Sequence, residues 1–273
     1  MTDDEQLTTG WEPDLPVEDT LLRRYLFHWA SYCAAIVETG GGAVTRTDDF
    51  AAADLRRPSG YYNSVTLLRP WASQSDADDV LGRVDAFYAD GWGEVLLWSA
   101  WPTPDLRARG WHLEGHPPVL IRPPATVLPP PEAPDIDVRR VTDAATLREW
   151  EQVVIEGYPL PELADGRAGT VADPSLLHDD RLAFWLGRDE AGRAVSVGTS
   201  FVDHGIGSFA LGVTRPEARR KGHWMRHAAE RLRHSPDLWM TGVFSDYSRP
   251  GAEAIGFVPV QRLTLWSKER PRR

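Results

Sequence analysis

Cysteine and lysine are scarce in this chain of 273 residues. Cys33 is the single cysteine, which excludes an intramolecular disulfide and a cysteine-based zinc site. Its place in an apolar helical pattern predicts a buried, inert thiol. No apolar run approaches the roughly 20 residues that a membrane helix needs, and the first residues are acidic where a signal peptide would be basic. We therefore expect a cytoplasmic protein with no membrane partner.

The charge balance is acidic, with 40 Asp and Glu against 30 Lys and Arg and a formal net charge of −10. Such a balance argues against nucleic acid as a partner. His223 and His227 have a spacing that binds metals on a helix, but no third ligand stands near them in the sequence. We expect solvent-facing histidines and no metal.

Prolines gather in one stretch, residues 123–134. Proline fixes φ and removes a backbone donor, so the stretch predicts an extended, semi-rigid linker. We therefore expect an N-terminal domain over residues 1–122, a linker over 123–135 and a C-terminal domain over 136–273.

Periodicity in the C-terminal part predicts an α+β fold with a mixed α/β sheet. Asp143 is expected to cap a helix with apolar positions at Leu147, Trp150, Val154 and Tyr158. A second helix follows residue 222 and ends before Pro236, and a short one covers 250–255. The expected strands cover residues 137–141, 182–186, 194–202, 208–213, 238–244 and 257–266.

The N-terminal part has similar elements in a less regular order. A long helix is expected over 17–37, and Ser75 is expected to cap another. A short helix is expected over 103–109. The expected strands cover residues 63–68, 94–100 and 119–122, the last one closing this part.

A basic loop between strand 208–213 and the next helix is the strongest functional signal. Arg219, Arg220 and Lys221 stand where the helix begins, and Gly222 allows a ligand to approach the backbone closely. The first N–H groups of a helix are unpaired and carry partial positive charge, which suits phosphate. The alternative is an ordinary solvated cluster of charges.

The loop resembles the acetyl-CoA pyrophosphate loop of the GNAT superfamily of N-acetyltransferases, Arg/Gln-x-x-Gly-x-Gly/Ala. The match covers Arg219-x-x-Gly222, and Trp224 replaces the last small residue. Residues 248–257, ending in Gly256-Phe257, resemble the late helix of the family. The resemblance spans about residues 136–268 and implies a GNAT-like C-terminal domain. The N-terminal part, with Gly110-Trp111 in the place of the Gly-Phe pair, looks like a degenerate copy, as in tandem GNAT proteins.

The resemblance also implies acetyl-CoA as co-substrate and assigns its contacts. The loop would hold the pyrophosphate through the backbone N–H groups of residues 219–224, and an N–H near Val213 would polarise the thioester carbonyl. The strand before the loop would pair with the pantetheine arm. The implied contact residues are Leu211, Gly212, Val213, Arg219, Arg220, Lys221, Gly222, His223 and Trp224.

Acetyl transfer to an amine needs a base, because a lysine-like amine with a pKa near 10.4 is protonated at neutral pH. Glu156, at the end of the first C-terminal helix, is the candidate base, with a solvated surface carboxylate as the alternative. The tyrosine that serves many members as acid is replaced by Ala252. Tyr247 is the substitute candidate, unless it only packs.

Two hypotheses follow. The first is an acyltransferase that moves an acetyl group directly, in a ternary complex, to a primary amine of a small molecule or peptide. The second is a non-catalytic module, derived from the same fold, that senses CoA or binds proteins. Trp224 either faces the core or blocks the phosphate seat. A set of tryptophans either lines the acceptor groove or packs in the core: Trp92, Trp98, Trp101 and Trp111. The sequence leaves the acceptor and the oligomeric state open.

Overall fold

The computed structural model describes residues 19–124, 136–158, 160, 163 and 169–272. Its helices are α1 (Leu21–Thr39), α2 (Gln74–Phe87), α3 (Ala144–Gly157), α5 (His223–Arg233) and α6 (Arg249–Ala254). Short 3-10 helices are η1 (Arg107–Arg109), η2 (Pro174–His178) and η3 (Pro216–Ala218). The strands of the first half are β1 (Ala43–Arg46), β2 (Phe50–Asp54), β3 (Ser64–Leu67), β4 (Val95–Ser99), β5 (His112–Gly115) and β6 (Pro118–Arg122). Those of the second half are β7 (Asp137–Arg140), β8 (Leu182–Arg188), β9 (Ala194–Asp203), β10 (Ile206–Thr214), β11 (Trp239–Val243), β12 (Val258–Arg262) and β13 (Thr264–Lys268).

Capping residues fix where the helices begin. The Asp143 side chain accepts from the N–H groups of Ala145 and Thr146, which confirms it as the cap of α3. Ser73, not Ser75, caps α2 through the N–H of Asp76, so that helix begins before Ser75. The described helices include none that is both long and apolar enough to cross a bilayer.

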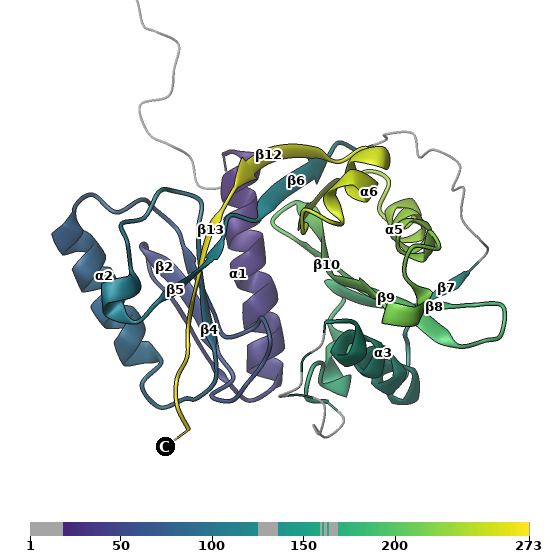
Figure 1. Ribbon diagram of the computed structural model, residues 1–273, viewed down its shortest axis with the longest axis horizontal. Coiled ribbons are helices and arrows are strands. Elements are labelled where there is room, and N and C mark those ends of the chain that lie inside the picture. The colour runs from purple at the N-terminus through teal and green to yellow at the C-terminus, as the bar shows by residue number, and fades with distance from the viewer. Residues whose placement is uncertain (1–18, 125–135, 159, 161–162, 164–168, 273) are drawn as a thin grey trace, which may run out of the picture.

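The strands form two mixed sheets, in agreement with the expected α+β class (Figure 1). One has six strands in the order β1-β2-β3-β4-β13-β5, and the other has seven in the order β12-β6-β11-β10-β9-β8-β7. Each sheet contains one parallel pair of strands: β3 with β4 in the six-stranded sheet, and β10 with β11 in the seven-stranded sheet. A parallel pair needs a crossover, which α2 and α5 supply.

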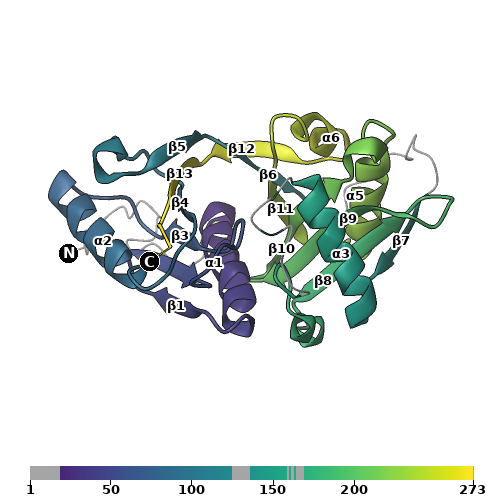
Figure 2. The same ribbon diagram turned by 60° about the horizontal axis from the view of Figure 1, so that its bottom comes forward.

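Helix α1 lies between the two sheets (Figure 1). Some of its buried residues pack in the apolar core that also contains residues of α3. Others pack in the apolar core that contains residues of β4. Helix α2 covers the far face of the six-stranded sheet. On the seven-stranded sheet, α3 covers the α1-facing side, whereas α5 and α6 cover the opposite side (Figure 2).

The two halves exchange a strand. We expected residues 119–122 to close the N-terminal part, but β6 lies in the seven-stranded sheet between β11 and β12. The expected strand 257–266 is two strands: β12 stays in that sheet, and β13 lies between β4 and β5 of the other. Figure 2 shows β6 and β12 running together between the halves. The sheets therefore do not follow the predicted division at residues 122 and 136, and the domain bounds stay a prediction.

Candidate functional site

Strand β10 loses its partner on one side halfway along its length. It pairs in parallel with β11 from Ile206 to Phe209, and the register ends at the pair Phe209–Gly242. Pairing with β9 continues to Thr214. Residues 210–214 therefore present a free edge on the side of β11, and this free edge is the candidate site. Unpaired strand groups are ready to bind an extended partner.

A β-bulge accompanies the free edge. The register with β9 shifts between Ala210 and Val213, and Leu211 has a φ of 47°, in the left-handed region. A non-glycine residue at positive φ is held there by its surroundings. Val213 packs against α3, where a side chain at Gly157 would come 2.4 Å from a Val213 methyl group. The bulge thus brings Leu211, Gly212 and Val213 to the free edge.

The basic loop follows directly and opens α5. Gly222 is the N-cap with a φ of 78°, and no side chain caps the helix. Arg220 also has positive φ, at 61°. Arg220 and Lys221 are exposed. An uncapped helix end beside exposed cations has the geometry expected of an anion seat.

Arg219 holds the loop in place. Its Nε donates to the Thr214 carbonyl at 3.1 Å, and its Nη2 donates to the Gly157 carbonyl at 2.6 Å. The guanidinium thereby joins the end of β10 to the C-terminus of α3, where orphan carbonyls need donors. These bonds show that Arg219 supports the loop, and its expected contribution of charge to the phosphate seat stays a prediction.

Trp224 packs beside the apolar cluster around Phe244 and Phe257. Its ring lies 6.1 Å from that of Phe244, edge to face. Glycines flank the indole: a Cβ built on Gly251 of α6 would lie 3.1 Å from it, and one on Gly212 would lie 3.3 Å from its Nε1. The side chain is half-buried and forms a wall between the free edge and α6.

The expected acid and base lie in other surroundings. Both carboxylate oxygens of Glu156 are engaged: Gln152 Nε2 donates to Oε1 at 2.6 Å, and Arg215 pairs with Oε2. Tyr247 is fully exposed, so no packing fixes its hydroxyl at the free edge. Ala252 is fully buried in the cluster below α6. The roles of Glu156 and Tyr247 remain hypotheses.

Two polar side chains that the sequence reading did not assign meet at Gly212. The Tyr158 hydroxyl donates to the Gly212 carbonyl at 3.2 Å. Arg231, from α5 on the other face, is 2% exposed, and its Nη2 lies 3.4 Å from where a Gly212 Cβ would be. Burial raises the pKa of Tyr158 above its ordinary range and lowers that of Arg231 to about 9.

The expectation of solvent-facing histidines on α5 is wrong. His223 and His227 are 6% and 2% exposed. His227 Nδ1 lies 2.9 Å from the Ser196 hydroxyl of β9. Burial lowers the pKa of both imidazoles, most strongly for His227. Small residues on the sheet make room for this polar face of the helix, since a Cβ on Gly187 would lie 3.2 Å from His227 Nδ1. Among the described residues no group of three or more His, Cys, Asp or Glu could hold a metal.

The equivalent position of the six-stranded sheet is filled by the protein itself. Strand β3 leads to α2, and the β2–β3 register continues without a bulge. At the start of α2, Asp76 accepts from the Ala72 N–H and from Arg69, and Arg69 also pairs with Asp49. A carboxylate of the chain thus lies beside the start of α2, which Ser73 caps.

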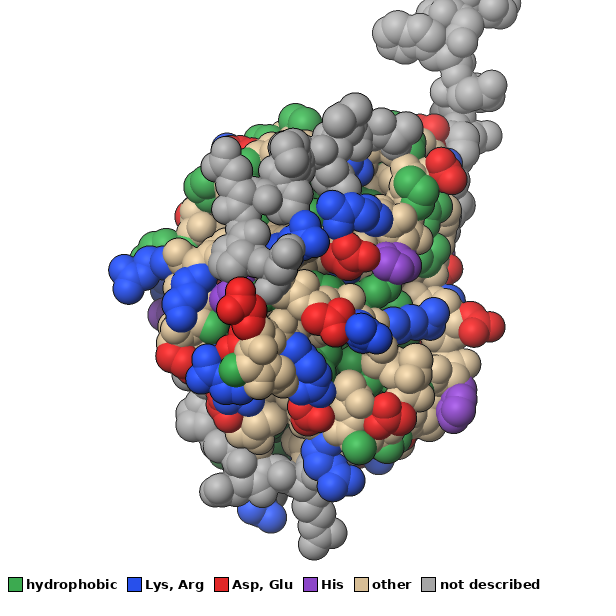
Figure 3. All heavy atoms as spheres, turned by 90° about the vertical axis from the view of Figure 1, so that its right-hand side faces the viewer, with side chains coloured by type: hydrophobic (Ala, Val, Ile, Leu, Met, Phe, Trp, Pro, Cys, Tyr) green, Lys and Arg blue, Asp and Glu red, His purple; other side chains and the backbone are tan. Residues whose placement is uncertain are grey.

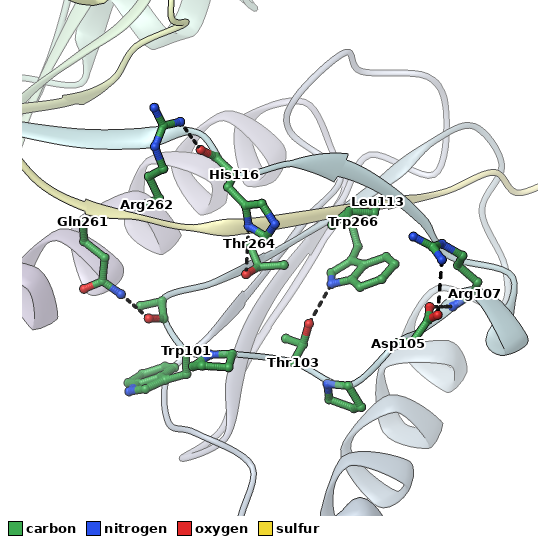
Figure 4. A pocket seen from close by; sticks show the side chains of 13 residues that line it. Trp101, Thr103, Asp105, Arg107, Leu113, His116, Gln261, Arg262, Thr264 and Trp266 are labelled. Carbon is green, nitrogen blue, oxygen red and sulfur yellow. Dashed lines mark hydrogen bonds and ion pairs between the residues drawn. The ribbon is translucent and has the colours of Figure 1, made fainter.

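A separate hollow of about 580 Å³ lies on the six-stranded sheet, away from the free edge (Figure 4). Trp101 and Trp266 line it, and Trp266 donates to the Thr103 hydroxyl at 2.9 Å. Trp98 and Trp111 are instead buried in the core.

Positive and negative side chains alternate on the face in Figure 3, which shows no field of one sign over the described residues.

Comparisons with solved structures identify the fold. A GCN5-related N-acetyltransferase from Kribbella flavida superposes with a TM-score of 0.57 at 15% identity, over 89% of this chain and 96% of that one. A GCN5-related N-acetyltransferase-like protein from Streptococcus suis gives 0.51 at 16% identity, over 91% and 98%. A tandem GNAT protein from the clavulanic acid biosynthesis pathway gives 0.50 at 13% identity, over 91% and 96%.

The chain therefore has the GNAT fold in the tandem arrangement. No family model and no curated protein matches it in sequence.

Proposed function

We propose that the second half of this protein is an acetyl-CoA-dependent N-acetyltransferase acting on a primary amine of a small molecule or peptide. The observation that carries the proposal is the free edge of β10, followed directly by an uncapped helix end with exposed cations. The expected contacts suit this geometry: Leu211, Gly212 and Val213 for the pantetheine arm, and the loop from Arg219 to Trp224 for the pyrophosphate.

The division of work between the halves supports the same proposal. The first half has no bulge at β3, and the end of α2 is capped by the Ser73 side chain, whereas α5 has no side-chain cap. We infer that one CoA molecule binds per chain, in the second half. The first half would then support the acceptor side, since α1 packs against the face of the seven-stranded sheet that α3 also covers.

The first prediction concerns CoA binding. Acetyl-CoA at 100 times its dissociation constant adds about 2.7 kcal/mol to the free energy of unfolding, which raises Tm by a few degrees in a chain of this size. The double variant Arg220→Glu/Lys221→Glu reverses two exposed charges of the loop without touching Arg219, and it is expected to abolish the shift. Differential scanning fluorimetry with acetyl-CoA and CoA measures both.

The control for that experiment is Arg139→Glu, which reverses an exposed charge on β7 far along the sheet from the loop. This variant should show the same rise in Tm with acetyl-CoA as the wild-type protein. No shift in the wild-type protein at millimolar acetyl-CoA, or an equal shift in the double variant, would contradict the proposed site. Release of CoA thiol with a panel of primary amines then tests transfer.

A non-catalytic CoA-binding module is the second candidate, and specific residues favour it. Ala252 stands where the family places its acid, Tyr247 is fully exposed, and Glu156 is engaged with Arg215 and Gln152. Binding of acetyl-CoA without thiol release across the amine panel would support this candidate over the enzyme.

A further inference from the structure

Arg231 is a buried cation for which the described residues provide no counter-ion. It lies on the third turn of α5, directly over the sheet, and is 2% exposed. Its Nη1 donates to the Thr199 carbonyl at 2.9 Å, and its guanidinium lies 3.8 Å from the centre of the Phe209 ring. Nε is buried with no acceptor among the described residues. Burying a charge that no opposite charge compensates is costly, so its retention needs a reason.

The surroundings of Arg231 supply no negative charge within the described part of the chain. His227, one turn earlier on the same face, has its pKa lowered by burial and by Arg231 itself, so it is neutral at pH 7. The sheet offers the hydroxyls of Ser196 and Thr199 and the backbone of Gly198. Gly198 is required, because a Cβ there would lie 2.4 Å from Arg231 Nη1. Gly198 thus leaves space on the sheet for the guanidinium, but the sheet residues named here carry no negative charge to balance it.

Two N–H donors lie on the same side of Gly212, a residue of the free edge. The atoms that a Cβ on Gly212 would meet within 4 Å are Trp224 Nε1 at 3.3 Å and Arg231 Nη2 at 3.4 Å. Neither donor has an acceptor among the residues that the structure describes. Strand β11 has already parted from β10 at this level, so a ligand lying along the free edge passes this point.

The geometry points to a carboxylate-binding subsite at Gly212, formed by Arg231 and Trp224, that selects substrates carrying a carboxylate. A guanidinium presents paired N–H donors that match a carboxylate, and the indole N–H adds a donor to one oxygen. The carboxylate has two chemical sources, an acyl chain ending in a carboxylate or an acceptor that is an amino acid. The inference rests on the proposed function, because the free edge must be the substrate site.

The test compares matched carboxylate and neutral probes on the full chain. One arm measures binding of succinyl-CoA against acetyl-CoA by calorimetry, and the other measures transfer from acetyl-CoA to lysine against cadaverine. A third arm needs no CoA: succinate against succinamide at equal ionic strength, followed by thermal shift. The expected result is at least a tenfold preference for the carboxylate in one of the first two arms, together with a shift by succinate alone.

The variants are Arg231→Met, which keeps the length and removes the charge, and Trp224→Phe, which keeps a ring and removes the N–H. Arg231→Met should reduce the preference to under twofold while acetyl-CoA binding persists, and Trp224→Phe should reduce it several-fold. Circular dichroism and Tm verify folding, and Arg231→Lys, which restores a charge, should recover part of the preference.

The outcomes separate the inference from the proposed function. Equal binding of carboxylate and neutral probes in all arms, or a preference that Arg231→Met leaves unchanged, overturns the subsite even if acetyl-CoA binds. An Arg231-dependent response to succinate with no response to any CoA compound supports the subsite and contradicts the acetyltransferase proposal.

Discussion

Trp224 decides how open the site is at the residue scale. The half-buried indole packs between Gly212, Phe244 and Gly251, in keeping with a core role. We expect Trp224→Ala to lower the free energy of unfolding by about 2 kcal/mol, less than for a fully buried aromatic, and not to raise the affinity for CoA. Urea unfolding and calorimetry with CoA measure the two effects. Met225→Ala, next in the chain and packed on the same cluster, is the matched control. A clear gain in CoA affinity would show that the indole blocks the phosphate seat.

Individual residues also show where sequence reasoning stopped. The loop from Arg219 to Gly222 was readable, because its glycine and cations stand at a strand-to-helix junction. Arg231 was not readable, since a charged helical residue is ordinarily solvated. Its burial depends on the missing side chain of Gly198, thirty-odd residues away in sequence, and no local pattern reports such a pairing. Arg219 was placed at the right loop, but its bonds to Thr214 and Gly157 arise from tertiary contacts.

At the scale of the element, β10 and β3 are the informative pair. Both strands run parallel to the next strand and lead into a helix, but only β10 has the bulge. The sequence predicted both strands, and the resemblance implied a degenerate copy in the first half. It did not predict the bulge, because Leu211 adopts positive φ without being a glycine. The bulge is set by packing of Val213 on α3 and by the Tyr158 bond to Gly212, which are contacts between elements.

Helix α1 makes stability depend on pH through His28. This residue is fully buried, its Nδ1 donates to the Asp203 carbonyl at 3.0 Å, and its Nε2 accepts from the Ser208 hydroxyl at 2.7 Å. Burial lowers its pKa to about 4. Between about pH 6.5 and pH 4 the unfolded chain therefore binds a proton at this imidazole and the folded chain does not. The free energy of unfolding falls as the pH drops over this range, by about 3 kcal/mol in total. His227, also with a lowered pKa, acts in the same direction.

Urea unfolding at steps from pH 7 to 4.5 measures this dependence. His28→Gln keeps a donor and an acceptor without titrating, so its stability should fall less steeply over that range. An unchanged slope in His28→Gln would contradict the assignment.

For the whole molecule, the exchange of β6 and β13 is the feature that the sequence could not supply. Strand lengths and the Gly-Phe and Gly-Trp endings indicated two similar halves, and the tandem GNAT fold agrees with that. Either closing strand has a hydrophobic pattern that suits either sheet, so local sequence cannot decide between them. Long-range geometry decides: β12 passes into β13 through Leu263, which is buried, and the chain crosses to the other sheet there.

The exchange predicts that the two halves unfold together. Removing β13 from between β4 and β5 opens the six-stranded sheet, and removing β6 from between β11 and β12 opens the other. Neither sheet is complete without the other half, so scanning calorimetry should show one transition with equal calorimetric and van't Hoff enthalpies. Leu97→Ala in β4 and Leu186→Ala in β8 each remove a buried side chain, at a cost of about 2–5 kcal/mol. Both variants should lower the same single Tm. Two resolved transitions, each moved by only one of the variants, would show that the halves are independent despite the shared strands.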